Sequence, residues 1–316
     1  MTKKIGVFPA SGGLGGSIVK HILELVPASN LVFIARHPDK LAEVSAAGAT
    51  VRKADYDDPS SLHRAFDGIG VLMLISYASF EYEYREKVHK IAIDSARRSG
   101  VEHIFYSSLG FGKGLSKETV AYVMKAHIAT EAYLDEVAKE NKNRFTYTAI
   151  REGIYSESFP IYTAWFDPKN PADEITIPHD GSGPGVAWVK RDELGEATAK
   201  LIAQYAKNPE AFPYLNKTIL LSGARVLTLA ETVEILGRIV GKPLRIRQIS
   251  VDEYTALPQI GDRHTYKGVN LSREWTTAWE GIRRGETAVV DPLLQQILGR
   301  EPEDFETTVR KLIASN

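Results

Sequence analysis

The amino-acid sequence predicts an α/β protein in which a doubly wound parallel sheet carries a smaller α/β lobe built from later segments. Two observations lead to this prediction. Short apolar runs alternate with helical patterns through the first half of the chain, and a glycine-rich turn joins the first run to the first helical pattern. Repeated strand–helix units require parallel strands with right-handed crossovers. From residue 153 onward an aromatic-rich pattern replaces the alternation and predicts the second lobe.

The composition excludes several functions. Of 316 residues, 43% are hydrophobic and 25% charged, which is typical of a soluble globular protein. Basic and acidic residues balance, 39 against 40, so we expect no direct nucleic-acid contact. No apolar run is long enough for a membrane span and the start lacks a signal-peptide core, so we expect no membrane association. The lack of cysteine excludes disulfides and thiolate metal sites; we expect no metal and a cytoplasmic location.

The first strand–helix unit carries the strongest functional signal. Residues 3–8 form an apolar run, residues 9–16 a glycine-rich turn, and residues 17–25 a helical pattern. Backbone N–H groups of such a turn approach a pyrophosphate, and the helix N-terminus supplies positive potential. The unit therefore predicts a dinucleotide site in a Rossmann-type domain, although Pro9 replaces the usual first glycine; a connector without a ligand is the alternative. The expected cofactor contacts here are Ala10, Ser11, Gly12, Gly13, Leu14 and Gly15.

The second and third units are shorter. Residues 30–35 are almost entirely apolar and predict a buried strand, followed by a helix near residues 38–47. Residues 50–53 predict a third strand, which leads through an acidic turn into a helix expected at residues 60–66.

The fourth and fifth strands complete the expected sheet. Residues 71–75 are a continuous apolar run, residues 81–99 a long helical pattern, and residues 103–107 the next strand. Ligands of such sheets bind beyond the carboxyl ends of the strands. That rule nominates the residues that follow each strand, and we expect further cofactor contacts from Arg36, Asp55, Tyr56, Ser76 and Ser108.

The end of the second strand predicts which dinucleotide is bound. An acidic residue there suits the ribose 2′-hydroxyl of NAD, whereas a basic residue accommodates the 2′-phosphate of NADP. Arg36 occupies this position and Lys40 lies one helical turn later, so we expect NADP(H) as the cofactor. The alternative is that both side chains are simply solvated on an exposed turn.

The second lobe is expected to hold the substrate. Tyr155, Phe159, Tyr162 and Trp165 could line an apolar cleft between the lobes, with Phe159 the most suited to the lobe core. We expect residues 1–152 to form the dinucleotide-binding domain, residues 186–248 largely to return to it, and residues 153–185 and 249–316 to form the substrate lobe.

The order of motifs resembles the NmrA-like branch of the atypical short-chain dehydrogenases/reductases, in particular its quinone oxidoreductase 2 and triphenylmethane reductase group. The resemblance spans most of the chain and implies a Rossmann fold, NADP(H) and reduction of a small molecule. Besides the N-terminal loop, the segments that carry it are residues 35–41, 55–59, 106–110, 127–131, 147–155, 189–196, 219–223, 228–231 and 298–302.

The catalytic residues are less clearly marked. Typical short-chain dehydrogenases use Tyr-x-x-x-Lys, but Tyr122 and Lys125 are separated by three positions rather than four. The resemblance places His127 where isoflavone-reductase-like relatives carry lysine and quinone oxidoreductase 2-like proteins carry histidine. Lys125 and His127 project in nearly opposite directions on a helix, and we expect His127 to face the nicotinamide and donate a proton. The alternative is a helix-stabilising pair of His127 with Glu131.

The resemblance and the residues together imply an NADPH-dependent reductase of a quinone-like or other conjugated carbonyl compound. In this interpretation Tyr155 borders an aromatic or carbonyl substrate, and Ser107 binds the substrate or the nicotinamide ribose. Two alternatives stay open: a non-catalytic NADP(H)-sensing regulatory protein, and a non-redox biosynthetic enzyme on the same fold. A homodimer or a regulatory protein partner also stays open.

Overall fold

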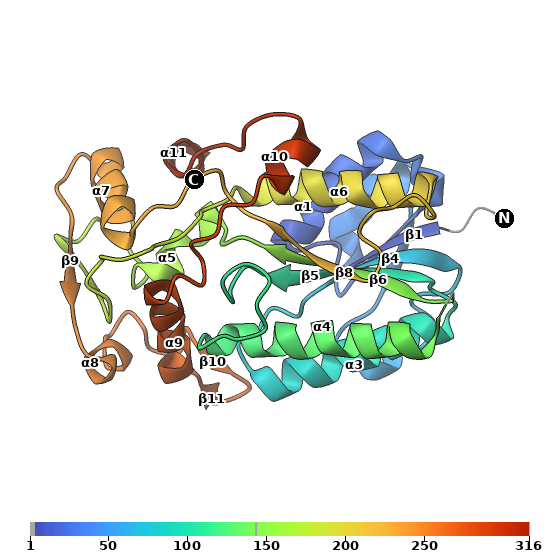
Figure 1. Cartoon of the computed structure of the whole chain (residues 1–316), viewed down its shortest axis with the longest axis horizontal. Coiled ribbons are helices and arrows are strands. Elements are labelled where there is room, and N and C mark those ends of the chain that lie inside the picture. Colours follow the sequence, from blue (N-terminus) through green and yellow to red (C-terminus); the bar gives the residue numbers. More distant parts are fainter. Residues whose placement is uncertain (1–3, 143, 316) are drawn as a thin grey trace.

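The computed structural model describes residues 4–142 and 144–315, and its largest element is a seven-stranded sheet (Figure 1). The strand order is β3-β2-β1-β4-β5-β6-β8 and every neighbouring pair is parallel, which confirms the doubly wound Rossmann-type fold. The strands are β1 Lys4–Phe8, β2 Leu31–Ala35, β3 Thr50–Lys53, β4 Ile69–Ile75, β5 His103–Leu109, β6 Thr146–Glu152 and β8 Lys217–Leu221. Residue 3, expected in the first strand, lies outside the described residues.

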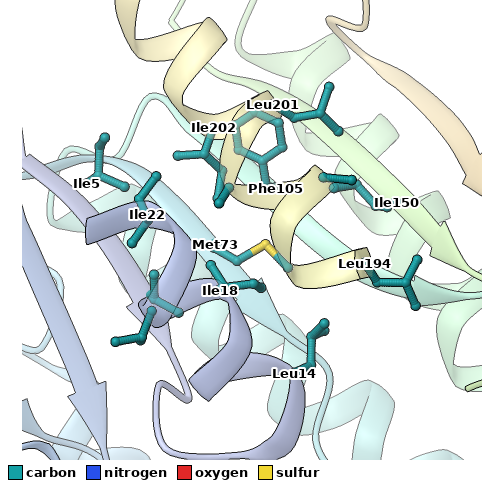
Figure 2. Packing of buried hydrophobic residues seen from close by; sticks show 14 of the residues in the cluster. Ile5, Leu14, Ile18, Ile22, Met73, Phe105, Ile150, Leu194, Leu201 and Ile202 are labelled. Atoms are coloured by element: carbon teal, nitrogen blue, oxygen red, sulfur yellow. The ribbon is translucent and has the colours of Figure 1, made fainter. Parts of the chain in front are cut away.

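Helices cover both faces of this sheet. α1 (Gly13–Leu25) and α6 (Arg191–Lys207) pack on one face, and α3 (Tyr82–Arg98) and α4 (Tyr122–Glu140) pack on the other (Figure 1). Figure 2 shows the first interface, where apolar side chains of both helices meet those of the central strands: Leu14, Ile18, Ile22, Leu194, Leu201, Ile202, Met73, Phe105 and Ile150. The three α1 residues recur every four positions, so they form one stripe along the helix. No helix among the described residues is long and apolar enough to cross a membrane.

The two short helices are less regular than the sequence predicts. Residues 38–47 form a 3₁₀ turn, η2 (Pro38–Leu41), followed by the short α2 (Ala42–Ala46). The helix expected at residues 60–66 is wrong, because only the 3₁₀ turn η3 (Pro59–Leu62) forms there. The chain must turn at Gly68, whose φ is +74°, to enter β4. That leaves too few residues to offset the cost of nucleating an α-helix.

The second lobe lies beyond the carboxyl ends of the strands. Its small sheet pairs β7 (Glu174–Ile177) with β9 (Arg245–Gln248) in parallel. Residues that follow three central strands, Phe80, Phe111 and Ile154, pack against the lobe's core. The remaining elements of the described chain are η1 Ala28–Asn30, η4 Ser156–Ser158, α5 Phe159–Tyr162, α7 Leu229–Val240, α8 Val251–Thr255, β10 Thr265–Tyr266, β11 Val269–Asn270, α9 Ser272–Arg283, α10 Leu293–Leu298 and α11 Phe305–Ser315.

Aromatic side chains fill the core of this lobe rather than lining an open cleft. Phe159 and Tyr162 are both buried there, the latter against Trp188 and Trp275 with ring centroids 5.5 and 5.3 Å away. The place in the lobe core that was expected for Phe159 is therefore confirmed, whereas the expected place of Tyr162 beside a substrate is not supported. Trp165 is partly buried under the guanidinium of Arg263.

Packing suggests different domain boundaries from those expected. Within residues 186–248, only α6 and β8 belong to the central sheet layer, whereas α7 and β9 pack in the lobe. Conversely, Leu294 and Leu298 of α10 pack with α6 against the sheet. We therefore propose that the chain leaves the sheet domain after β8 and that α10 returns to it.

Candidate functional site

The glycine-rich turn leads directly from β1 into α1. The backbone N–H of Ala10 donates to Ile34 O at 2.8 Å, which fixes the turn against β2. A Cβ at Gly15 would lie 2.2 Å from Pro9 O, so only glycine allows this close approach of turn and helix. A Cβ at Gly12 would meet no described atom within 4 Å, so the outer side of the turn is open. The expected cofactor turn therefore has the shape that a pyrophosphate requires.

Exposure separates the six expected turn residues into two kinds. Ser11, Gly12 and Gly13 are exposed and can meet a ligand directly. Ala10, Leu14 and Gly15 are buried, so they could contribute only backbone groups.

A cation that sequence reasoning missed lies across this turn. Arg191 begins α6, and a Cβ at Gly13 would lie 2.7 Å from its Nη1. Its backbone N–H donates to the carboxylate of Glu157 at 3.1 Å, which fixes the start of the helix. No carboxylate among the described residues lies within 4 Å of its guanidinium. This positive charge therefore adds to that of the α1 N-terminus.

The expected 2′-phosphate site lies at the end of β2. Arg36 is exposed, and its Nε lies 3.9 Å from Asp55 Oδ2, too far for a hydrogen bond. Lys40 is exposed on η2, four positions later. Both cations are thus accessible to a phosphate, as the sequence predicts, and Asp55 lies next to them.

Two expected cofactor contacts are not supported. Tyr56 is 2% exposed, and its hydroxyl donates to Ile75 O at 2.7 Å while its ring packs on Phe8. Ser108 is also buried, and its hydroxyl donates to Glu131 Oε1 at 2.5 Å. Neither side chain is available to a ligand. Tyr56 packs in the apolar cluster on the α3 and α4 face, and Ser108, which lies inside β5, points toward Glu131 of α4.

Ser76 and Ser107 come together at the carboxyl ends of β4 and β5. Ser107 Oγ accepts a hydrogen bond from the backbone N–H of Ser76 at 3.0 Å. Ser76 Oγ in turn accepts from Arg85 Nη2 at 2.8 Å. The two expected site residues therefore belong to one polar network at the edge of the sheet.

His127 is the centre of this network. Arg85 Nη2 donates to His127 Nε2 at 2.7 Å, and the Tyr106 hydroxyl lies 3.1 Å from His127 Nδ1. Because a guanidinium only donates, the ring proton is on Nδ1 and points to Tyr106. Burial and the nearby Arg85 charge hold the pKa of His127 well below its usual range. This neutral, fully engaged ring does not support the expected role of His127 as a direct proton donor.

The alternative interpretation of His127 is not supported either. Glu131 pairs with Arg151 at 2.7 Å in a buried salt bridge instead of with His127. The prediction that Lys125 and His127 point apart is confirmed, because Lys125 is exposed with its Nζ 5.1 Å from the Tyr122 ring centroid. Sequence reasoning missed Arg85, whose position in α3 gave no signal of its burial.

Arg85 is a buried cation without an acidic partner. It is 3% exposed, its Nη1 donates to Val123 O at 3.0 Å, and no carboxylate among the described residues lies within 4 Å. Burial lowers its pKa, and its Nε has no hydrogen-bond partner in the described part of the chain. Such a group favours an anion or a developing negative charge nearby.

A carboxyl group ends β6 at the same edge of the sheet. Glu152 is fully buried, and the Tyr155 hydroxyl donates to its Oε2 at 2.5 Å. Burial raises the pKa of Glu152 to about 8. Sequence reasoning expected Tyr155 at the site but missed Glu152, three residues earlier.

Aromatic side chains close the site on the lobe side. Phe80, which follows β4, stacks on Trp275 of α9 with ring centroids 4.8 Å apart and meets Tyr266 edge-on at 5.4 Å. The next residue, Lys267, pairs with Asp57 at 3.0 Å, so the β10–β11 hairpin reaches across to the sheet domain. The lobe therefore presents aromatic surface to the carboxyl edge of the sheet.

Comparisons with known proteins agree on one family. Residues 1–279 match the model of the NmrA-like family. The chain is similar to the NmrA-like family domain-containing oxidoreductase flvB of Aspergillus flavus, with 31% identity over 97% of this chain and 94% of the relative. It is 30% identical to quinone oxidoreductase 2 of Escherichia coli over 80% of each chain. A solved structure of Citrobacter sp. triphenylmethane reductase complexed with NADP(H) matches with a TM-score of 0.75 and 26% identity, covering 98% of this chain and 99% of that one.

Proposed function

The chain belongs to the NmrA-like family and is an NADPH-binding oxidoreductase of that type, and we propose that its substrate is a quinone-like or other conjugated carbonyl compound. The single observation that supports binding of the cofactor is the glycine turn, which is open at Gly12 and lies beside the guanidinium of Arg191. The substrate part rests on the aromatic surface over the carboxyl edge of the sheet.

The residues present fit NADPH. Backbone groups of residues 10–15 would hold the pyrophosphate, and Arg36 with Lys40 would hold the 2′-phosphate. Bound in this way, NADPH supplies a hydride at the carboxyl edge of the sheet. Arg36, exposed and without a hydrogen-bonded acidic partner in the described chain, suits this task better than a structural one.

The substrate is expected between this edge and the lobe. Phe80 and Tyr266, which are both partly exposed, offer flat apolar surface that favours an aromatic or conjugated molecule, and the buried Trp275 stacks on Phe80. Arg85 and Ser76 supply hydrogen-bond donors and positive charge, which would stabilise an oxyanion that develops as a carbonyl is reduced. The E. coli relative is named a quinone oxidoreductase, which agrees with this substrate class.

We propose distinct roles for the three expected catalytic residues. Ser107 orients Ser76 and, through it, Arg85. His127 acts as a positioning residue, because it accepts from Arg85 and so fixes the guanidinium. Tyr155 borders the substrate, and its hydroxyl donates to the carboxyl group of Glu152.

A regulatory NADP(H) sensor is the second candidate. The observation in its favour is that both ring nitrogens of His127 are engaged, so the residue in the family's lysine position does not donate a proton directly. A sensor would bind the cofactor and leave it unreacted.

Anaerobic oxidation of NADPH, followed by its absorbance against a panel of quinones and enones, tests the proposal. We expect turnover with at least one member and faster reaction with NADPH than with NADH. Calorimetry on the same protein gives cofactor affinity independently of turnover. Tight NADPH binding without oxidation across the panel would favour the sensor, and no binding at millimolar concentration would contradict both candidates.

A further inference from the structure

Glu152 is a buried acid that the fold does not satisfy. It is the last residue of β6 and has 0% exposure. Its Oε2 accepts from the Tyr155 hydroxyl at 2.5 Å, but its Oε1 is buried without a hydrogen-bond partner among the described residues. A buried polar oxygen without a partner destabilises the folded state. Such groups cluster at functional sites, where the strain is part of the chemistry.

The pair lies at the carboxyl edge where the cofactor and substrate would meet. Glu152 is in register with Leu109 of β5 and Leu221 of β8, at the ends of both strands. Tyr155 bridges to Val189, two residues before Arg191, and packs against the same apolar cluster as α1. Arg191 in turn touches Gly13 of the cofactor turn. The phenol is therefore held between the cofactor turn and the start of α6.

Burial keeps both groups of the pair protonated near neutral pH. It raises the pKa of Glu152 to about 8, and the smaller effect of the Tyr155 hydrogen bond opposes this shift. Burial and the neighbouring Glu152 also hold the pKa of Tyr155 above its usual range, while the Arg191 charge lowers it. A protonated carboxyl group and a phenol in contact form a short chain of two transferable protons.

We propose that Tyr155 is the proton donor of the reduction and that Glu152 is the positioning residue that orients and reprotonates it. This inference rests on the proposed function. NADPH, when bound, would supply a hydride that forms a C–H bond on the substrate, and the two electrons of that hydride would reduce the carbonyl compound as the cofactor is oxidised. The Tyr155 O–H bond breaks as the substrate oxygen gains that proton. Loss of the phenol proton ends the hydrogen bond that Tyr155 donates to Glu152 Oε2. The protonated carboxyl group of Glu152 then turns its O–H toward the phenolate oxygen and passes its proton to it, and the resulting carboxylate recovers a proton from water.

Glu152 and Arg191 both favour the proposed proton transfer from Tyr155. A carboxylate left on Glu152 after proton transfer is the charged form that burial disfavours, which drives its reprotonation between turnovers. Arg191 helps the same step, because its positive charge favours the transient phenolate.

The test compares Glu152→Gln and Tyr155→Phe with the parent protein, using a quinone or enone that the panel shows to be reduced. Tyr155→Phe is expected to lower single-turnover reduction by about 10²–10⁴-fold. Parent turnover is expected to fall as pH rises through the pKa of Glu152, and Glu152→Gln is expected to lose this dependence. His127→Ala is the contrast variant and is expected to keep it. Calorimetric affinity for NADPH should be the same in the parent, Glu152→Gln and Tyr155→Phe.

A second measurement does not depend on turnover. Infrared spectra of the cofactor-free protein at neutral pH should show a protonated carboxyl band that Glu152→Gln lacks. Absence of that band, wild-type turnover in Tyr155→Phe, or an unchanged pH profile in Glu152→Gln would overturn the inference while leaving the reductase function intact. Absence of turnover in the parent protein with every substrate, despite NADPH binding, would instead overturn the proposed function and this inference with it.

Discussion

At the scale of single residues, we propose that two arginines contact the expected cofactor at different chemical groups. Arg36 lies at the end of β2, where only NADP carries a phosphate, whereas Arg191 lies across Gly13, where NAD and NADP share the pyrophosphate. The two side chains therefore predict different patterns of cofactor selectivity, and each serves as the control for the other.

Arg36→Ala should weaken NADPH binding by about 1.5–3 kcal/mol, the scale of a charge-assisted hydrogen bond. NADH binding should stay unchanged, because its ribose has no phosphate for Arg36 to contact. Calorimetry with both cofactors measures the two losses. Equal losses would mean that Arg36 supports the fold or contacts the adenine instead.

Arg191→Ala should weaken NADPH and NADH alike, again by about 1.5–3 kcal/mol. Arg191→Lys should recover part of the affinity, because lysine restores the charge without the planar fork of donors. The same calorimetric titrations measure this effect. Unchanged affinity for both cofactors in Arg191→Ala would show that the guanidinium only packs against the turn.

Residues of the site were predictable only where the chain itself reveals their surroundings. The glycine turn and Arg36 were predictable, because the strands and turns that place them are contiguous in the sequence. Glu152 and Arg191 were not predictable as site residues, because what marks them is burial and contact with neighbours on other elements. His127 was nominated by position, but its protonation depends on Arg85, 42 residues earlier, so its role could not be derived from spacing.

At the scale of elements, the junction of β1 and α1 is the critical contact. Gly15→Ala would place a methyl group 2.2 Å from Pro9 O, so the turn or the helix must shift. We expect loss of NADPH affinity by at least tenfold together with a lower unfolding free energy, since small displacements of a binding loop cost affinity steeply. Calorimetry and urea denaturation measure the two effects.

Gly16→Ala is the matched control for that variant. A Cβ at Gly16 meets nothing within 4 Å among the described residues, and the position is already helical. Alanine there should raise stability by up to about 1 kcal/mol and leave cofactor affinity unchanged. If Gly15→Ala behaved like Gly16→Ala, the close approach of turn and helix would not be required for binding.

Long elements were predicted well and short ones poorly, for a physical reason. α3 and α4 repeat an apolar stripe over several turns, so their periodicity outweighs local exceptions. The stretch at residues 59–66 is too short to show a period, and its outcome depends on the Asp58 cap and the turn at Gly68. Likewise, α7 has a clear helical pattern, but nothing in its sequence indicates that it packs in the lobe rather than on the central sheet.

At the scale of the whole molecule, buried titratable groups set how stability varies with pH. Burial lowers the pKa of five histidines, to about 3 for His103 and about 4 for His264; the other three are His89, His127 and His179. Burial raises the pKa of Glu152 to about 8, which is the opposite direction. The two kinds of group therefore act in opposite directions between acid and neutral pH.

The sign for each kind follows from proton binding. Below about pH 6.5 the histidines of the unfolded chain bind protons, whereas the buried histidines of the folded protein stay neutral. The unfolding free energy that they contribute is therefore fully present above about pH 6.5. It falls by up to about 1.4 kcal/mol for each histidine and each pH unit as the pH is lowered. Glu152 contributes stability that is fully present below the ordinary pKa of an unfolded glutamate, about 4.3, and is lost between that pH and about pH 8. Five histidines outweigh one carboxyl group, so the unfolding free energy should be greatest near pH 6.5–7, fall steeply toward about pH 5, and decline gently toward about pH 8.5.

Urea denaturation across this range measures the unfolding free energy as a function of pH. Two variants separate its fall below about pH 6.5, the acid limb, from its decline above neutral pH. His103→Gln should make the acid limb shallower, because it removes a buried imidazole whose pKa is lowered to about 3 in the folded protein. Glu152→Gln should flatten the gentle decline above neutral pH, because an amide does not ionise. It should also make the change in stability between about pH 5 and 6.5 steeper, by up to about 1.4 kcal/mol per pH unit, because the opposing contribution of Glu152 is gone. Stability that stays constant between about pH 6.5 and 5 in the parent protein would mean that the buried histidines accept protons in the folded state. In that case His127 could carry a charge beside Arg85, and a role for it as an acid would become tenable again.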